Sequence, residues 1–275
     1  MPELPEVETI ARALRQGSDI APPIVGKVFT DAVILWERSL ETPSLEEFKA
    51  RIPGQKVSDV GRRGKFLHIR LNDVSLIIHM RMSGGITVES QEKNIAPHDR
   101  LVLNFDDGWR LVFNDTRKFG RVWLVDDPEE IFSKLGPEPL DAVFTPVVLH
   151  QRLTAYRRQI KLLLMDQSFL AGMGNIYTDE ALHLACIYPL TRSDSIKEKQ
   201  AQALWRSIRQ VLTDGILNNG ASIDWVYRGG EFQNYFRVYQ KTGEPCPVCK
   251  TPVVRIVVGQ RGTHLCPTCQ PAPGE

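Results

Sequence analysis

Residues 100–113 have the sequence RLVLNFDDGWRLVF. Two runs rich in β-favouring residues, 100–105 and 109–113, flank Asp107-Gly108, and an Asp-Gly pair between such runs is a strong signal for a β-hairpin. Short runs of the same kind recur at 66–71, 75–79 and 121–125. Many short strands joined by Gly, Asn and Asp turns indicate an antiparallel sandwich or barrel, and they argue against a parallel sheet that alternates with helices.

Helical periodicity appears on both sides of this β-rich region. From Glu3 to Arg15, apolar residues recur at the spacing of an amphipathic helix. The stretch LGPEPL, residues 135–140, indicates a linker, and four later segments have helical period without proline: 147–156, 160–165, 176–185 and 195–217. The sequence therefore predicts an α+β chain with an N-terminal antiparallel β-sandwich domain and its helix (1–134), a linker (135–146), a helical domain (147–234) and a β-hairpin region (235–275).

Composition limits the class of protein. A chain of 275 residues is longer than one average domain, and 42% hydrophobic residues is ordinary for a folded chain. Apolar runs stay well short of the roughly 20 residues that cross a bilayer, and the start lacks a signal-peptide core, so we expect a cytoplasmic protein without a membrane partner. Residues 1–150 carry 19 Lys and Arg against 23 Asp and Glu, whereas residues 151–275 carry 15 against 10. The net charges of −4 and +5 allow a polyanion-binding face in the second half.

Four of the five cysteines form two CxxC pairs. Cys246 and Cys249 make the first pair, Cys266 and Cys269 the second, and sixteen residues separate them. This is the spacing of a four-thiolate zinc site, with a hairpin between the pairs; two disulfides or unused thiols are the alternative, which a cytosolic chain disfavours. Four thiolates leave no open position for water, so we predict one structural zinc ion. Cys186 has apolar helical surroundings and is expected to be a buried core thiol.

The N-terminus, MPELPEVE, has two interpretations. Pro2 and the acids after it are favourable residues at a helix start. A small residue after Met1 also allows removal of the methionine, and this leaves a secondary amine that can attack a sugar C1′ as a Schiff-base nucleophile. Pro2 is a catalytic candidate only as the first residue of the mature chain.

Several motifs in order resemble those of the formamidopyrimidine-DNA glycosylase family, whose relatives include endonuclease VIII. The resemblance covers essentially the whole chain. The matching motifs are PELPEVE (2–8), RRGKF (62–66), HMRMSG (79–84), DTRKFG (115–120), GMGNIY (172–177) and the terminal four-cysteine module.

The resemblance implies a bifunctional DNA glycosylase and abasic-site lyase, in which Pro2 forms an iminium and β,δ-elimination cuts the strand. It implies that Glu3 is the acid/base of the reaction, that Glu6 is a second acid of the site, and that Lys65 serves base recognition and elimination. Arg261 matches an arginine that grips a phosphate and is linked to δ-elimination. Without the resemblance, Glu6 is a helix-start carboxylate, Lys65 part of a basic cluster and Arg261 a phosphate clamp.

The resemblance also implies contacts with damaged double-stranded DNA. Met82, Arg117 and Phe119 match residues that fill the gap left by an everted base. Taken singly, Met82 and Phe119 would more often be sandwich core and Arg117 a surface ion pair. Asn175 matches a contact to the DNA backbone in a helix-two-turns-helix element, although it also suits a helix N-cap. His98, Lys161 and Arg157 are further candidate contacts.

Alternative functions remain at this point. The combination of Met82, Arg117 and Phe119 favours oxidised purines such as 8-oxoguanine and formamidopyrimidines over the oxidised pyrimidines of an endonuclease VIII-like enzyme. A glycine-rich loop at residues 227–232 looks shorter than in many members, which leaves the lesion preference open. The zinc hairpin and the basic second half alone would also fit a non-catalytic zinc-containing DNA-binding protein. We expect a monomeric repair enzyme of the bacterial cytoplasm that acts on the nucleoid.

Overall fold

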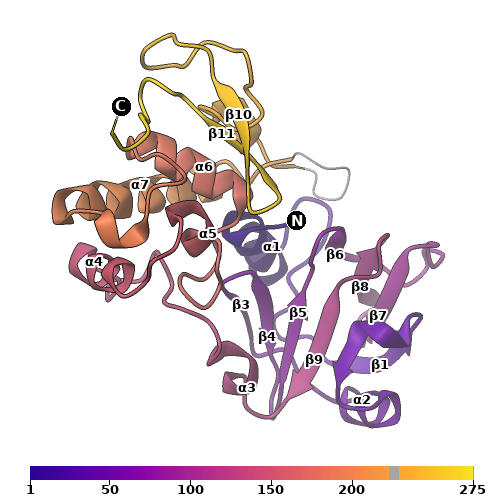
Figure 1. Ribbon diagram of the computed structural model, residues 1–275. Helices are drawn as coiled ribbons and strands as arrows, with labels where there is room; N and C mark the ends of the chain where they lie inside the picture. Colours follow the sequence, from indigo (N-terminus) through magenta and orange to yellow (C-terminus); the bar gives the residue numbers. More distant parts are fainter. Residues whose placement is uncertain (223–228, 275) are drawn as a thin grey trace. The chain divides into compact units, whose positions relative to one another are not determined.

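The computed structural model describes residues 1–222 and 229–274 (Figure 1). The chain separates into two compact units, of which the first contains Met1–Lys134 and the second contains Leu135–Ser222 and the C-terminal segment from Gly229. Within the described residues, none of the helices combines the length and hydropathy needed to span a membrane. Residues 227 and 228 of the predicted glycine-rich loop lie outside the described residues.

The first unit is a sandwich of two sheets. One sheet has the order β1 (Phe29–Ile34), β7 (Asp99–Phe105), β8 (Trp109–Asp115), β6 (Gly84–Ser90), and the other has the order β2 (Leu40–Thr42), β9 (Arg121–Val125), β5 (Ser75–His79), β4 (Phe66–Arg70), β3 (Asp59–Arg63). The predicted hairpin is confirmed: β7 and β8 are antiparallel, with Val102 opposite Val112. One pairing departs from the antiparallel prediction, because the three-residue strand β2 runs parallel to β9. A strand this short leaves no pattern in the sequence.

Apolar side chains between the sheets form the core of this unit. Phe29, Leu67, Leu76, Leu103 and Phe113 are all at most 2% exposed. Helix α1 (Leu4–Gln16) lies against β3 and β4 (Figure 1). Its apolar residues Leu4, Val7, Ala11 and Leu14 are buried. Two short helices, α2 (Leu45–Arg51) and α3 (Glu129–Phe132), and the 3-10 turn η1 (Glu37–Ser39) complete the unit. Burial of this continuous apolar set is the main stabilising contribution.

The second unit begins with helices near the predicted positions: α4 (Pro146–Thr154), α5 (Ile160–Leu164), α6 (Asn175–Leu184) and α7 (Glu198–Leu217). Helix α7 starts later than predicted because Ser193–Ser195 forms a separate 3-10 turn, η2. Helices α6 and α7 approach closely at Gly215, where an added Cβ would lie 2.5 Å from the Tyr177 ring. A side chain at this position would separate the two helices.

The C-terminal part of this unit is a hairpin. After the 3-10 turn η3 (Phe232–Tyr235), strands β10 (Val254–Val258) and β11 (Arg261–Leu265) pair with Val258 opposite Arg261. Gly259 and Gln260 join them with φ values of 53° and 63°, the signs that a two-residue type I′ turn requires. The hairpin predicted between the CxxC pairs is therefore present.

The prediction of a buried core thiol at Cys186 is wrong. Helix α6 ends at Leu184, and Cys186 lies in the turn after it with φ 55° and an exposed side chain. The helix whose apolar period suggested burial ends two residues before Cys186.

Candidate functional site

The N-terminal residues lead directly into α1. Pro2 is buried, and Glu3, the residue before the helix, is 3% exposed. The Glu3 backbone N–H donates to Glu6 Oε2 at 2.8 Å, so the Glu6 carboxylate satisfies one of the free N–H groups of the helix start. The structure thus shows a local capping contact for Glu6. Its predicted part in the chemistry, like those of Pro2 and Glu3, stays a proposal.

Lys65 lies in the two-residue turn between β3 and β4. Arg63 pairs with Phe66 across this turn, Gly64 has φ 55°, and Lys65 is 4% exposed. Strand β3 is fastened to α1 by Arg62, whose Nε lies 3.0 Å from Glu8 Oε2. The turn that carries Lys65 therefore joins the two strands against which the N-terminal helix packs.

Two loops of the first unit carry the predicted gap-filling residues. We call residues 80–83 and 116–120 the wedge loops. Met82 is 41% exposed and Phe119 is 46% exposed, so the alternative that they are sandwich core is wrong. The Arg117 guanidinium lies over the Phe119 ring, 4.9 Å from its centroid. Exposed apolar residues beside a cation suit insertion into a base stack better than burial in the sandwich.

His79 holds the first wedge loop through a hydrogen bond to its backbone. Its Nδ1 accepts the Arg81 N–H at 3.1 Å and holds Arg81 at φ 53°, the residue before Met82. Burial lowers the pKa of His79 to about 3, and the positive charges of Arg81 and Lys65 act in the same direction. A neutral imidazole keeps Nδ1 available as an acceptor. Sequence reasoning did not single out this histidine.

We expect the two buried histidines, His68 and His79, to lower the stability of the first unit at acid pH. Burial also lowers the pKa of His68 to about 4, and unfolded histidine titrates near 6.5. Below about pH 6.5 the unfolded chain binds protons that the folded chain excludes, so each histidine removes about 1.4 kcal/mol of unfolding free energy per pH unit. Urea unfolding at pH 7 and pH 5 should show this loss. His68→Gln, which can keep the contact to Ser75 Oγ, should lessen the slope, and an unchanged slope would contradict the assignment.

Lys161 does not fit the predicted phosphate contact. Its side chain is fully buried, and its Nζ lies 2.6 Å from Asp179 Oδ1 and 2.7 Å from Thr263 Oγ1. The ammonium is held inside the second unit because a buried carboxylate neutralises it. Lys161 also donates to the Gly262 carbonyl at 3.3 Å, next to Arg261.

Asn175 is the first residue of α6, and Gly174 occupies the N-cap position instead. Its Nδ2 donates to the Gly262 carbonyl at 3.0 Å, so Asn175 holds the same hairpin turn as Lys161. Arg261 is exposed at the start of β11. The structure therefore brings these three predicted residues to one turn of the second unit.

The remaining predicted contacts lie on the surface. His98 is exposed in the turn before β7, where its Nδ1 is 3.3 Å from Arg100 Nη2. The Arg157 side chain is 85% exposed and lies 3.6 Å from Asp194. Both positions are accessible to a phosphate.

Two acids on α6 were missed by sequence reasoning. Asp179 Oδ2 accepts the His264 N–H at 2.9 Å, and Glu180 accepts backbone N–H groups from Arg237, Val238 and Tyr239. Burial raises the pKa of Glu180, while the three N–H groups oppose that shift. Two adjacent acids in the middle of a predicted helix, between apolar residues such as Tyr177 and Ala181, were the available signal. Asp179 fastens β11 to α6, and Glu180 fastens residues 237–239, which precede the hairpin, to the same helix.

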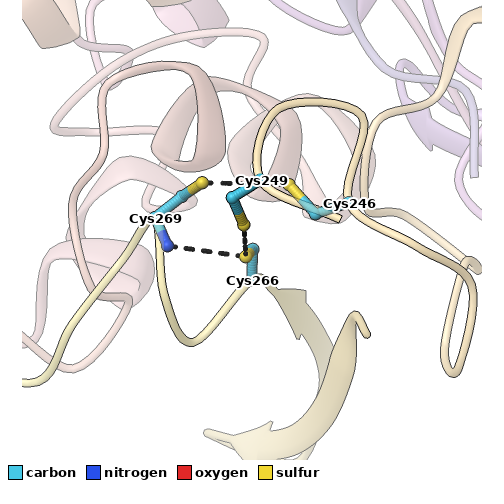
Figure 2. A group of neighbouring side chains, drawn as sticks. All are labelled: Cys246, Cys249, Cys266 and Cys269. Carbon is cyan, nitrogen blue, oxygen red and sulfur yellow. Dashed lines mark hydrogen bonds between the residues drawn. The ribbon is translucent and has the colours of Figure 1, made fainter. Parts of the chain in front are cut away.

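The four cysteines of the CxxC pairs gather as predicted. Their Sγ atoms all lie within 4.8 Å of one another, and the side chains point toward a common centre (Figure 2). The Cys249 and Cys266 sulfurs are 3.3 Å apart, those of Cys246 and Cys269 3.8 Å apart. Four thiolates at about 2.3 Å from one tetrahedral metal would be separated by about 3.8 Å, so the donor set fits one zinc ion. His183 Nε2 lies 3.4 Å from Cys246 Sγ, the position of an outer contact that orients a ligand.

A β-sandwich unit and a helical unit that ends in a four-cysteine hairpin are the architecture of a zinc-containing DNA-repair glycosylase. The sequence matches the formamidopyrimidine-DNA glycosylase N-terminal domain over residues 1–122, the H2TH domain of the same enzymes over 135–226, and the zinc finger found in FPG and IleRS over 243–272. The chain belongs to the formamidopyrimidine-DNA glycosylase family. It is a DNA glycosylase with one structural zinc site.

Individual relatives are similar along the full length. The formamidopyrimidine-DNA glycosylase of Chloroflexus aurantiacus is 46% identical, covering 98% of each chain, and that of Enterococcus faecalis is 39% identical, covering 100% of this chain and 99% of its own. A Lactococcus lactis FPG mutant, solved as a complex with a Fapy-dG containing DNA, has a TM-score of 0.91 and 34% identity, covering 98% of this chain and 100% of its own.

Proposed function

We propose that this enzyme excises oxidised purines, 8-oxoguanine and formamidopyrimidines, from double-stranded DNA and then cleaves the strand. The observation that carries the proposal is the full-length similarity to proteins whose structures are complexes with Fapy-dG containing DNA and carbocyclic 8-oxo-G containing DNA. The exposed wedge loops support it, since an enzyme that everts a base must fill the gap it leaves.

In this proposal, Pro2, Glu3, Glu6 and Lys65 of the first unit carry out the reaction at the sugar. Removal of Met1 turns the Pro2 nitrogen into a secondary amine, which attacks the sugar C1′ and gives up its N–H proton while the bond from C1′ to the damaged base breaks. Protonation of the ring oxygen O4′ then opens the C1′–O4′ bond and leaves an iminium between the Pro2 nitrogen and C1′. Glu3 transfers protons at the sugar and stabilises the cation beside it. Glu6 supports this site from α1, and Lys65 offers an ammonium for base recognition and elimination. Successive β and δ eliminations then cut the strand.

DNA is held by groups from both units. Met82, Arg117 and Phe119 fill the gap, with Arg117 donating to the orphaned base. Asn175 and Arg261 contact the phosphates near the lesion, and Arg261 assists δ-elimination. His98 and Arg157 contribute further phosphate contacts, whereas Lys161 acts by holding the turn beside Arg261.

The remaining features of the proposal concern the whole chain. We assign residues 1–134 to the catalytic domain, 135–146 to the linker, 147–234 to the helix-two-turns-helix domain and 235–275 to the zinc finger. The enzyme acts as a monomer without a membrane partner, in the bacterial cytoplasm on the nucleoid.

A panel of lesion duplexes with borohydride tests the function. We expect a covalent protein–DNA adduct with 8-oxoguanine opposite cytosine, and faster excision of 8-oxoguanine and formamidopyrimidine than of thymine glycol. Preference for thymine glycol would instead support the endonuclease VIII-like alternative. Binding without any trapped adduct, from a chain whose N-terminus is verified as Pro2, would support the non-catalytic alternative, because binding alone reports mainly backbone electrostatics.

A further inference from the structure

The wedge loops are neighbours at both of their ends. Each loop crosses from one sheet of the sandwich to the other, the first from β5 to β6 and the second from β8 to β9. His79, the last residue of β5, pairs with Arg121, the first of β9. Gly84, the first residue of β6, pairs with Asp115, the last of β8. Strand register therefore sets the two loops side by side.

A buried carboxylate connects the two loops. Asp115 is fully buried, and its Oδ1 accepts a hydrogen bond from the Ser83 hydroxyl of the first loop. The same oxygen accepts the Arg117 N–H of the second loop at 3.1 Å, and Oδ2 accepts the Gly120 N–H at 2.7 Å. The Ser83 hydroxyl oxygen also accepts the Arg117 N–H at 3.0 Å. A buried carboxylate with this many donors holds its neighbours firmly, because releasing any of them leaves charge unsatisfied.

Close packing beneath the loops prevents either from moving alone. An added Cβ at Gly84 would lie 2.4 Å from the Met80 carbonyl oxygen, and one at Gly120 would lie 2.2 Å from Phe113 Cζ. Both glycines therefore lie in close contact with buried groups, and the buried Phe113 ring is a neighbour of each. The loop ends have no space in which to shift by themselves.

We propose that Asp115, with Ser83, is a positioning residue that joins the wedge loops, so that Met82, Arg117 and Phe119 enter the base stack as one body. This inference rests on the proposed function and deepens it. Asp115 does not touch DNA in this scheme. It fixes the backbone N–H of Arg117, so the guanidinium keeps a set direction toward the orphaned base while Met82 and Phe119 hold the gap open. Preorganisation of this kind reduces the ordering cost when the lesion is everted.

Asp115→Asn tests whether this carboxylate links the two wedge loops, because the substitution changes the shape of the side chain little. An amide has one acceptor oxygen, so either orientation turns an NH₂ toward a donor that the carboxylate had accepted. We expect excision of 8-oxoguanine to fall about 10- to 100-fold, the cost of a small misplacement at a reacting site. Cleavage of DNA that already contains an abasic site should fall by less than about threefold, because no base has to be everted. The ratio of excision opposite cytosine to excision opposite adenine should also fall, since Arg117 loses its fixed direction.

Glu89→Gln is the matched control. Glu89 pairs with Arg110 on the same two strands, β6 and β8, and its Oε1 accepts Arg110 Nε at 3.0 Å and Nη2 at 2.6 Å. It lies away from the wedge loops, so the variant should lose comparable thermal stability and keep excision, abasic cleavage and the opposite-base ratio. Equal effects of the two substitutions on all three readouts would overturn the proposal.

A double-mutant cycle keeps the test decisive if Asp115→Asn does not fold. Ser83→Ala and Phe119→Ala change different loops, so their effects on excision should multiply if the loops are independent. We expect the excision rate of the double variant to fall clearly less than the product of the two single-variant losses. Losses that simply multiply would overturn the proposal that the two loops act as one body. The wild type must give the borohydride adduct in the same series. Its absence would refute the proposed function, whereas an adduct with independent loops would refute only this inference.

Discussion

An enzyme that keeps any residue in front of Pro2 should form no borohydride adduct and should lose excision by at least about 10³-fold, the scale seen when a nucleophile is removed. The reason is that the Pro2 nitrogen is nucleophilic only when it carries no acyl group. In an internal proline the nitrogen belongs to an amide and its lone pair is delocalised, whereas in an N-terminal proline it is a basic secondary amine. A short N-terminal extension blocks removal of Met1 without altering any side chain. Affinity for lesion DNA should change little, because phosphate contacts dominate binding.

Pro5 provides the matched control for this prediction. It is buried like Pro2 and lies in the first turn of α1. Pro5→Ala removes a helix-start proline and should cost some stability while the adduct still forms. Mass spectrometry of the intact protein verifies which N-terminus each sample carries. An adduct from the extended chain at the wild-type rate would show that another amine, such as Lys65, is the nucleophile.

The sequence predicted the elements whose signals are local. The Asp107-Gly108 hairpin, the N-terminal helix and the paired CxxC motifs each depend on residues close together in the chain, and all three are present. The exposure of Met82 and Phe119 was harder to predict. Apolar residues are more often buried than exposed, and these two are exposed because they lie in loops that connect the two sheets, outside the sandwich core.

Contacts between distant segments escaped sequence reasoning. Lys161 looked like a surface phosphate contact in a basic run, yet Asp179 on α6 and Thr263 on β11 enclose it. No local pattern reports that a lysine will meet a carboxylate 18 residues away and a hydroxyl 102 residues away. Asp115 is similar. Its acceptor role requires Ser83, which is 32 residues earlier in the chain. Buried polar groups with remote partners are the part of this site that no local sequence pattern indicates.

Removing the metal should unfold the C-terminal hairpin and strongly weaken DNA binding. The hairpin has a small core: Val258 and Leu265 are 2% exposed, whereas Val254 is 37% exposed and Val257 is 64% exposed. Its fold therefore depends on the four thiolates, and a structural zinc site contributes about 10–16 kcal/mol in small zinc domains. We expect a strong chelator, or Cys266→Ala, to lower lesion-DNA affinity by at least about 100-fold, because each lost phosphate contact weakens binding.

Cys186→Ala is the matched control for metal removal. It removes an exposed thiol outside the cluster, so zinc content by metal analysis, hairpin protection in amide hydrogen exchange and DNA affinity should all stay at the wild-type level. In Cys266→Ala the amides of β10 and β11 should lose protection, while those of the sandwich in the first unit keep theirs, since that core contains no metal ligand. Zinc-free protein that still protects Val258 and Leu265 and binds DNA at full strength would mean that the hydrogen bonds of Lys161, Asn175 and Asp179 to β11 hold the hairpin in place without the metal.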